Sequence, residues 1–329
     1  MQVDVVLISY NQEQYIAQAL ESILMQRVKD DVHVRVIVAD DCSKDKTLEI
    51  IKSYEDKSPF PFVYLQNSYN LGMVDNYRRV LTTIEADFFT ILEGDDYWLD
   101  THKLQKQLDT MSQNSNCGLC YADCSILNES VMTYADGLYY SLQRTINTTN
   151  PLLETHYQSN VTWMIRGDMK KYFVIPDGCT DIPLIFMYEC CLHSEVIFIP
   201  QVFGVFRVHL GSVSNQRQNT YSKYLYQRNV FMLCDSYVDK FPNTEDVRKK
   251  FYTDALFQLY MQAIQYADNK FITMLKTHIQ GLDWDNVEQH LKEISAMSTD
   301  INHIRSTHAY KLGKFILIPL KKLKQLFKL

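Results

Sequence analysis

Three acidic residues follow an apolar segment in the first third of the chain. Glu93, Asp95 and Asp96 come directly after the apolar residues 88–92. Clustered carboxylates repel one another unless a cation or solvent offsets their charge. Mg²⁺ and Mn²⁺ are typically held by one or two carboxylates together with phosphate oxygens of a substrate. The cluster therefore predicts a Mg²⁺ or Mn²⁺ site, and the alternative is a solvated turn before the helix expected at residues 102–111.

A second acidic cluster follows the β-branched residues 34–39. It contains Asp40 and Asp41, with Ser43 and Asp45 close behind. Asp and Ser commonly cap the beginning of a helix, which explains Ser43 or Asp45. Capping does not explain two adjacent acids, so we expect Asp40 and Asp41 to line a ligand crevice.

The elements that position these acids alternate between strand and helix. Strands are expected at residues 3–9, 34–39, 62–66 and 88–92, with helical patterns between them. This alternation predicts an α/β fold with right-handed crossovers and a mostly parallel central sheet covered by helices on both faces. Ligands bind at the carboxyl ends of the strands in such sheets. The two acidic clusters, together with Tyr10 and Asn11 after the first strand, should therefore face one crevice.

Composition excludes several functional classes. The ten glycines form no GxG, so the dinucleotide fingerprint and the P-loop are both absent. A net charge of −6 argues against a nucleic-acid partner. With no basic stretch near the crevice, a bound diphosphate would need a divalent cation to offset its charge.

Cysteine usage and apolar runs indicate the cellular setting. Cys117, Cys120 and Cys124 lie in an apolar segment that predicts a buried strand with structural thiols in preference to a zinc site. Asp4 interrupts the apolar N-terminal run, and the longest apolar run, residues 315–320, is too short to cross a bilayer. We therefore expect reduced thiols in a cytoplasmic protein.

Several segments in order resemble a known family. VDVVLISYNQEQYIAQAL, VRVIVADDCSKDKT, NLGMVDNYRRVL and ADFFTILEGDDYW resemble the opening motifs of the inverting family 2 glycosyltransferases of the GT-A fold. The resemblance continues through KLQKQL, VTWMIRGDMKK, CTDIPLIFMYECC and VFGVFRVHLGSVS. It implies a nucleotide-sugar-binding and catalytic GT-A domain at residues 1–214. The patterns that follow predict a helical extension at 215–308 and a basic tail at 309–329.

The resemblance implies a donor and a metal site. Asp40 or Asp41 matches the acid that contacts the nucleotide base or ribose. The turn EGDD matches the acidic metal motif, with Glu93 in place of the usual Asp and Asp95 as the preferred ligand. The other candidates for the nucleotide, diphosphate or metal are Tyr10, Asn11, Asn70, Arg78, Arg79, Asp96, Arg207 and His209. Taken without the family, His209 is an ordinary polar residue.

The segment CTDIPL resembles the one that bears the family's catalytic base. Asp181 is the matching residue, and Glu189 is the fallback. The same Asp181 could simply begin a helix with Pro183 in its first turn. Trp98 and Trp163 could stack on a sugar, although buried aromatic residues are usually part of a core.

The implied reaction is transfer of a sugar, with inversion, from a UDP-linked donor to a glycan or lipid-linked acceptor, giving a β-linkage. A sugar-phosphate nucleotidyltransferase should carry a Gly- and Arg-rich loop after the first strand, where this chain has ISYNQEQY. A catalytically inactive glycan-binding or scaffold protein would lack the carboxylates at residues 40, 95 and 181, which are present.

The tail carries six lysines and no acidic residue from Lys311 to Leu329. Its apolar residues Leu320, Leu323 and Phe327 fall on one helical face. A basic amphipathic helix of this kind binds anionic lipid. The tail therefore predicts peripheral attachment to the inner face of the plasma membrane, with a helix docked on its own domain as the alternative.

Overall fold

The computed structural model describes residues 1–65, 67–129, 133–135, 159–212, 220–241, 259–278, 284, 285 and 289. The chain forms two compact units, Met1–Tyr252 and Thr253–Leu329. In the second unit, residues 259–265 and α9 (Asn269–His278) are helical. The boundary predicted at residue 214 and the basic tail at 309–329 both lie outside the described residues.

The first unit is built on a mixed sheet, of which the described residues form nine strands. They are β1 (Gln2–Ser9), β2 (His33–Asp40), β3 (Phe62–Tyr64), β4 (Phe88–Glu93), β5 (Tyr97–Trp98), β6 (Cys117–Asn128), β7 (Thr133–Ala135), β8 (Met164–Arg166) and β9 (Glu195–Val208). Their order is β3-β2-β1-β4-β8-β6-β9-β5, and β7 pairs with β6. The pairs β2–β3, β1–β2, β1–β4 and β6–β9 are parallel, whereas β8, β5 and β7 pair antiparallel. The α/β prediction is confirmed, and all four expected strands are present.

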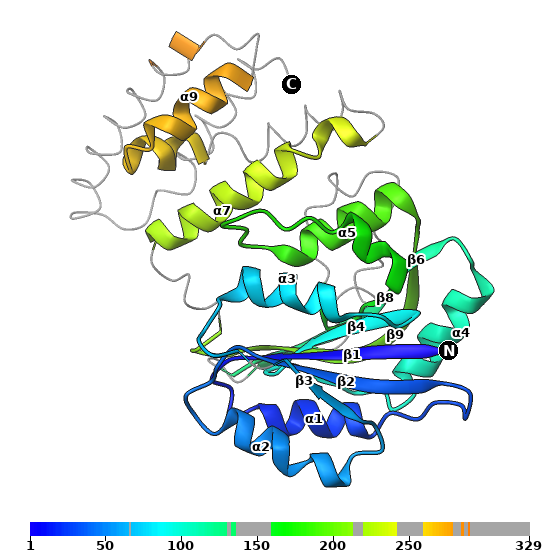
Figure 1. Cartoon of the computed structure of the whole chain (residues 1–329). Helices are drawn as coiled ribbons and strands as arrows, with labels where there is room; N and C mark the ends of the chain where they lie inside the picture. The colour runs from blue at the N-terminus through cyan, green and yellow to red at the C-terminus, as the bar shows by residue number, and fades with distance from the viewer. Residues whose placement is uncertain are drawn as a thin grey trace. The chain divides into compact units, whose positions relative to one another are not determined.

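Helices cover both faces of this sheet (Figure 1). They are α1 (Ile16–Leu24), α2 (Thr47–Ser53), α3 (Met73–Thr83), α4 (Lys103–Gln113) and α5 (Ile182–His193), and α7 (Thr220–Asp235) packs on α5. Short 3₁₀ helices lie at Glu55–Lys57, Asn160–Thr162, Gly167–Tyr172 and Val238–Lys240. The apolar residues of α1, α2 and α4 pack on one face of the sheet, and those of α3 and α5 pack on the other.

The two cores follow from the alternation of side chains along each strand. In β1, Val5 and Leu7 join the core under α1, while Val6 joins the core under α3. All three side chains are fully buried, as expected for a strand covered on both faces. The functional consequence is that the loops following β1, β2 and β4 emerge together at one edge of a rigid sheet.

The predicted cysteine strand is confirmed as β6. Cys117, Cys120 and Cys124 are buried and not disulfide-bonded. Burial raises the pKa of Cys117 to about 11 and that of Cys124 to about 12, so both thiols stay protonated at neutral pH. They serve as small apolar side chains of the core.

Both tryptophans in question belong to the core. Trp98 and Trp163 are each 3% exposed, and the Trp98 indole donates a hydrogen bond to the carbonyl of Val161 (2.8 Å). The ammonium of Lys103 lies 4.2 Å from the Trp98 ring centroid and donates to Gln107 (2.8 Å). Burial lowers the pKa of Lys103 to about 7. Trp98 and Trp163 therefore pack in the core instead of offering a face on which a sugar could stack.

No helix in the described part of the chain is long and apolar enough to cross a membrane.

Candidate active site

The turn that follows β4 is held against the loop after β1. The Gly94 amide donates to the carbonyl of Ile8 (2.8 Å), and the Asp96 amide donates to the carbonyl of Glu93 (2.9 Å). A Cβ atom on Gly94 would lie 2.4 Å from Oε1 of Gln12. Glycine leaves room here for the ends of the Gln12 and Ile16 side chains, which a larger residue would displace.

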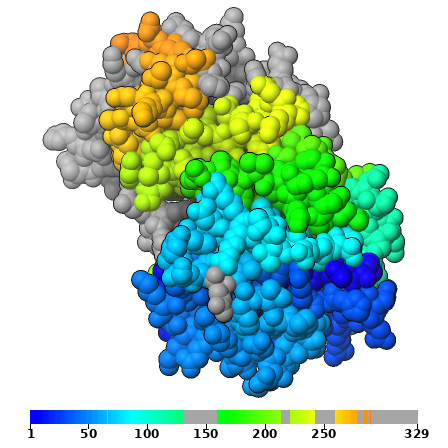
Figure 2. All heavy atoms as spheres, in the orientation of Figure 1, coloured from blue at the N-terminus to red at the C-terminus, as the bar shows by residue number. Residues whose placement is uncertain are grey.

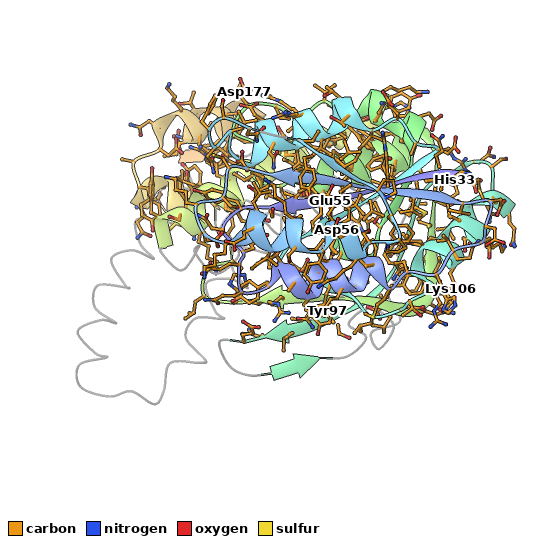
Figure 3. The ribbon with its side chains drawn as sticks, turned by 60° about the horizontal axis from the view of Figure 1, so that its bottom comes forward. His33, Glu55, Asp56, Tyr97, Lys106 and Asp177 are labelled. Carbon is orange, nitrogen blue, oxygen red and sulfur yellow. The ribbon has the colours of Figure 1, made fainter. Side chains whose placement is uncertain are left out.

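Arg207, near the end of β9, fastens the turn from its other side. Its amide donates to Oδ1 of Asp96 (2.8 Å), and its Nε donates to the carbonyl of Asp95 (2.7 Å). The guanidinium also pairs with Glu129 and lies 5.3 Å from the ring centroid of Tyr97, which is labelled in Figure 3 beside α1. These contacts position the acidic turn. The predicted contact of Arg207 with a donor diphosphate stays a prediction.

Asp95 pairs with His209, and its carboxylate has one oxygen without a partner. Oδ2 of Asp95 lies 3.1 Å from Nε2 of His209. Oδ1 is buried and has no hydrogen-bond partner in the part of the chain that the structure describes. A buried carboxylate oxygen without a donor is costly, and a cation would satisfy it. This oxygen therefore fits the predicted metal.

His209 itself is hydrogen-bonded on both ring nitrogens. The Gly211 amide donates to Nδ1 (3.2 Å), which leaves Nε2 to donate to Asp95. The ring also packs on Tyr15, with ring centroids 4.4 Å apart. To ligate a cation through Nε2, the ring proton would have to move to Nδ1. Asp95 therefore fits the cation better than His209, whose ligand role stays a prediction.

Glu93 and Asp96 differ from Asp95 in their electrostatics. Burial and the nearby charge of Asp95 raise the pKa of Glu93 to about 7, although Tyr77 and Asn160 donate to its Oε1 (3.1 and 3.4 Å). Burial, followed by the charges of Asp95 and Glu93, raises the pKa of Asp96 well above its usual value. Burial thus disfavours the charged forms of Glu93 and Asp96. Among the described residues, no three His, Cys, Asp or Glu side chains converge as a complete protein-only metal site.

Asp181 stands at the beginning of α5, beside this turn. Its side chain makes no capping hydrogen bond to its own helix, although Pro183 follows in the first turn as predicted. Instead, the hydroxyl of Tyr226 in α7 donates to Oδ2 of Asp181 (2.6 Å). The charge of Asp181 contributes to the raised pKa of Glu93, which places this carboxylate near the acidic turn. The predicted base therefore stands at the N-terminus of α5, but its side chain does not cap that helix.

The fallback base, Glu189, is placed elsewhere. It lies two turns further along α5, about 12 Å from Asp181 along the helix axis. Tyr237 donates to its Oε1 (2.6 Å), and His193 lies 3.3 Å from its Oε2. The Tyr237 contact joins α5 to the segment after α7, and the His193 contact lies within α5, so both have a structural role.

Asp40 and Asn11 join the loops after β1 and β2. Asp40 accepts from the amide of Ser43 (2.9 Å) and from the hydroxyl of Ser9 (2.8 Å). The Asn11 amide donates to Oγ of Ser43 (2.9 Å), and Asn11 Oδ1 accepts from the Lys44 amide (2.8 Å). Asn11 has a φ of 52°, a left-handed conformation that asparagine tolerates. Tyr10 next to it is 42% exposed and so accessible to a ligand.

Asp41 organises the loop after β3. Its carboxylate accepts from the amides of Leu71 (2.7 Å) and Gly72 (2.8 Å). Oδ1 of Asn70 accepts from the same Gly72 amide (2.9 Å). Arg78, in the helix that follows, donates through Nη2 to the carbonyl of Ile175. The predicted contacts of these residues with a nucleotide, and that of Arg79, stay predictions.

Several residues that hold the acids or Arg207 were not identified from the sequence. Glu129 pairs with Arg207, Asn160 and Tyr77 donate to Glu93, and Tyr226 donates to the predicted base. Tyr77 stands within NLGMVDNYRRVL, so the motif contained it without revealing its role. For the others, no local sequence signal exists, because each contact joins segments far apart in the chain.

Comparisons of the sequence with known proteins give a family match and a relative. The family model described as Glycosyl transferase family 2 matches residues 4–173. An uncharacterized protein of Mycobacterium tuberculosis is 29% identical over 209 residues, which are 64% of this chain and 59% of that protein. The chain therefore spans less than two thirds of that relative.

Two solved structures share the fold. TarS of Staphylococcus aureus, a poly(ribitol-phosphate) beta-N-acetylglucosaminyltransferase, was solved as its 1–349 fragment with UDP-GlcNAc. It superimposes with a TM-score of 0.52 at 15% identity, covering 79% of this chain and 81% of that one. The mannosyltransferase PcManGT of Pyrobaculum calidifontis, with GDP-Man and Mn²⁺, has a TM-score of 0.55 at 14% identity. It covers 99% of this chain and 87% of that one.

Proposed function

Because the chain belongs to glycosyl transferase family 2, we propose that it is an inverting, metal-dependent glycosyltransferase. The donor is a nucleoside-diphosphate sugar, with UDP as the nucleotide, and the acceptor is a hydroxyl of a glycan or a lipid-linked oligosaccharide. The observation that carries the proposal is the buried Oδ1 of Asp95, which has no hydrogen-bond partner among the described residues. Asp181, at the beginning of α5, lies near enough to the same acidic turn for its charge to raise the pKa of Glu93. The UDP-GlcNAc complex of TarS supports the choice of nucleotide.

In the proposed reaction Asp181 is the general base. It takes the proton of the acceptor hydroxyl while the acceptor oxygen bonds to the anomeric carbon of the donor. The bond from that carbon to the diphosphate breaks on the opposite side, and the diphosphate leaves with the electron pair. Attack opposite to the leaving group inverts the anomeric centre, so an α-linked donor gives a β-linked product.

Asp95 would hold Mn²⁺ or Mg²⁺ together with donor phosphate oxygens, and Glu93, Asp96 and His209 are the other predicted ligands. A cation bound there offsets negative charge on the departing diphosphate. Arg207 holds the acidic turn in position by donating hydrogen bonds to the Asp95 carbonyl and the Asp96 carboxylate. The complex of PcManGT with GDP-Man and Mn²⁺ supports the use of a divalent cation.

Thermal stabilisation of the full chain by nucleotides tests the donor class. We expect UDP with Mn²⁺ to raise the melting temperature and EDTA to remove the shift, because a ligand that binds only the folded state stabilises it, by about 2.7 kcal/mol at a hundred times Kd. GDP, dTDP and CMP serve as matched controls. A larger shift with one of these would reassign the nucleotide. No metal-dependent shift with any of the four would contradict the proposed donor site.

The proposal includes contact with a membrane through the tail at residues 309–329, and so a cytoplasmic, peripheral location. The tail lies outside the described residues, and its six lysines carry the argument. We expect the full chain to sediment with vesicles of anionic phospholipid and a chain ending at residue 310 to stay in the supernatant. Equal sedimentation of the two chains would refute the membrane contact.

A further inference from the structure

Helix α7 packs along α5 in the first unit, and Figure 2 shows the two helices in contact at the surface. Val230, Leu233 and Cys234 of α7 contact the apolar side of α5, where Tyr188 is buried. The hydroxyl of Tyr188 lies 3.2 Å from Sγ of Cys234. Tyr226 precedes Val230 by four residues, so it lies on the same face of α7. Apolar packing therefore sets the position of Tyr226 relative to the beginning of α5.

Tyr226 reaches the carboxylate at the beginning of α5. Its hydroxyl donates to Oδ2 of Asp181 at 2.6 Å, the short distance of a charge-assisted hydrogen bond. Asp181 makes no hydrogen bond to the amides of its own helix, so the usual restraint on an N-terminal aspartate is missing. The orientation of the carboxylate is set from α7 instead.

We propose that Tyr226 is a positioning residue for the catalytic base Asp181, an inference that rests on the proposed function. The hydroxyl holds Oδ2, so the carboxylate keeps one orientation toward the acceptor. A hydrogen bond donated to a carboxylate also favours its charged form, which opposes the repulsion from the neighbouring acidic turn. The acceptor proton goes to Asp181, and Tyr226 keeps its own.

The same pair of elements provides a matched control. Tyr237 donates to Oε1 of Glu189, also at 2.6 Å, and Glu189 is a carboxylate of the same helix α5. Replacing Tyr226 or Tyr237 by phenylalanine removes one hydroxyl and one hydrogen bond to a carboxylate on α5. The two changes therefore remove chemically equivalent contacts, and only the first touches the proposed base.

The experiment compares Tyr226→Phe and Tyr237→Phe in the full chain, with UDP-GlcNAc and Mn²⁺ as the probe and UDP release from pH 5 to 9 as the readout. For Tyr226→Phe we expect kcat to fall about tenfold, with the donor KM within about twofold, from loss of a hydrogen bond to a charged group. Without the Tyr226 hydroxyl, the charged form of Asp181 loses a hydrogen bond, so the pKa of the base rises. The acid limb of the pH–rate profile should therefore move to higher pH by about one unit. Tyr237→Phe should leave this limb in place.

A second measurement does not depend on turnover. The ¹³C carboxyl resonance of Asp181, assigned with Asp181→Asn, should titrate at a higher pH in Tyr226→Phe than in the wild type and in Tyr237→Phe. An unmoved titration, or equal kinetic effects of the two phenylalanine variants, overturns the inference and leaves Tyr226 a packing residue. By contrast, a wild-type chain that releases no UDP, or an Asp181→Asn variant that turns over normally, identifies the proposed function as the failure.

Discussion

We expect the Asp181→Asn variant to lose about a thousandfold in kcat for sugar transfer while its affinity for the nucleotide donor changes by less than about threefold. General-base catalysis contributes about 10² to 10⁴ in rate, and an amide has no basic oxygen near neutral pH. The fold should persist, because the amide oxygen can still accept the Tyr226 hydroxyl and Asp181 makes no capping bond that would be lost. The measurement pairs transfer kinetics with nucleotide binding by titration calorimetry.

Glu189→Gln is the matched control for this result. Glu189 is an acid on the same helix, and its partners Tyr237 and His193 give it a structural role. We expect its transfer rate to stay within about threefold of the wild type. A base at residue 189 is indicated if Glu189→Gln loses transfer and Asp181→Asn keeps it.

The second large effect is expected for Asp95→Asn. This variant should lose both the Mn²⁺-dependent stabilisation by UDP and about three orders of magnitude in transfer, because the carboxylate oxygen suited to the cation is replaced by a neutral amide. Thermal melting with UDP and Mn²⁺ measures the first effect without any need for an acceptor. Transfer kinetics at saturating Mn²⁺ measure the second.

Asp96→Asn separates the metal ligand from its neighbour in the turn. Oδ1 of residue 96 receives the Arg207 amide, a bond that the amide oxygen of asparagine can also accept. Burial raises the pKa of Asp96 well above its usual value, which lowers the cost of replacing this carboxylate by a neutral amide. We therefore expect Asp96→Asn to keep most of the Mn²⁺-dependent shift. Loss of the shift in Asp96→Asn with retention in Asp95→Asn would reverse the ranking.

Local patterns predicted the part of the fold in which contacts are close in sequence. The alternation of apolar strands and amphipathic helices in residues 1–93 matches β1 to β4 and their helices. In the other half of the sheet, the cysteine-containing strand β6 was predicted but its pairing was not. Strand β6 pairs parallel with β9, whose register Cys117 to Glu195 joins residues far apart in the chain. Such pairing brings together segments that are distant in the sequence, so it leaves no periodic pattern of apolar residues by which it could be predicted.

The sequence allowed the acidic residues of the candidate site to be chosen, but not their hydrogen-bond partners. Asp95 and Asp181 could be selected because they follow a strand and precede a helix in recognisable motifs. The partners of Asp40 and Asp41 could not be predicted, because a carboxylate in such a loop can accept hydrogen bonds from backbone amides or contact a ligand. The conformation of the loop determines which of these it does. Tyr226 is one of 22 tyrosines, and nothing nearby in sequence distinguishes it.

The hydrogen bonds between the loops after β1 and β2 have a consequence for donor recognition. The Asn11 amide donates to Oγ of Ser43, Asn11 Oδ1 accepts from the Lys44 amide, and Glu13 and Asp45 each accept an amide of the opposite loop. Two surface loops that restrain each other lose little conformational entropy when a ligand arrives. We therefore expect the proposed nucleotide to bind at this edge as a rigid-body event, with little of its binding energy offset by ordering of the chain.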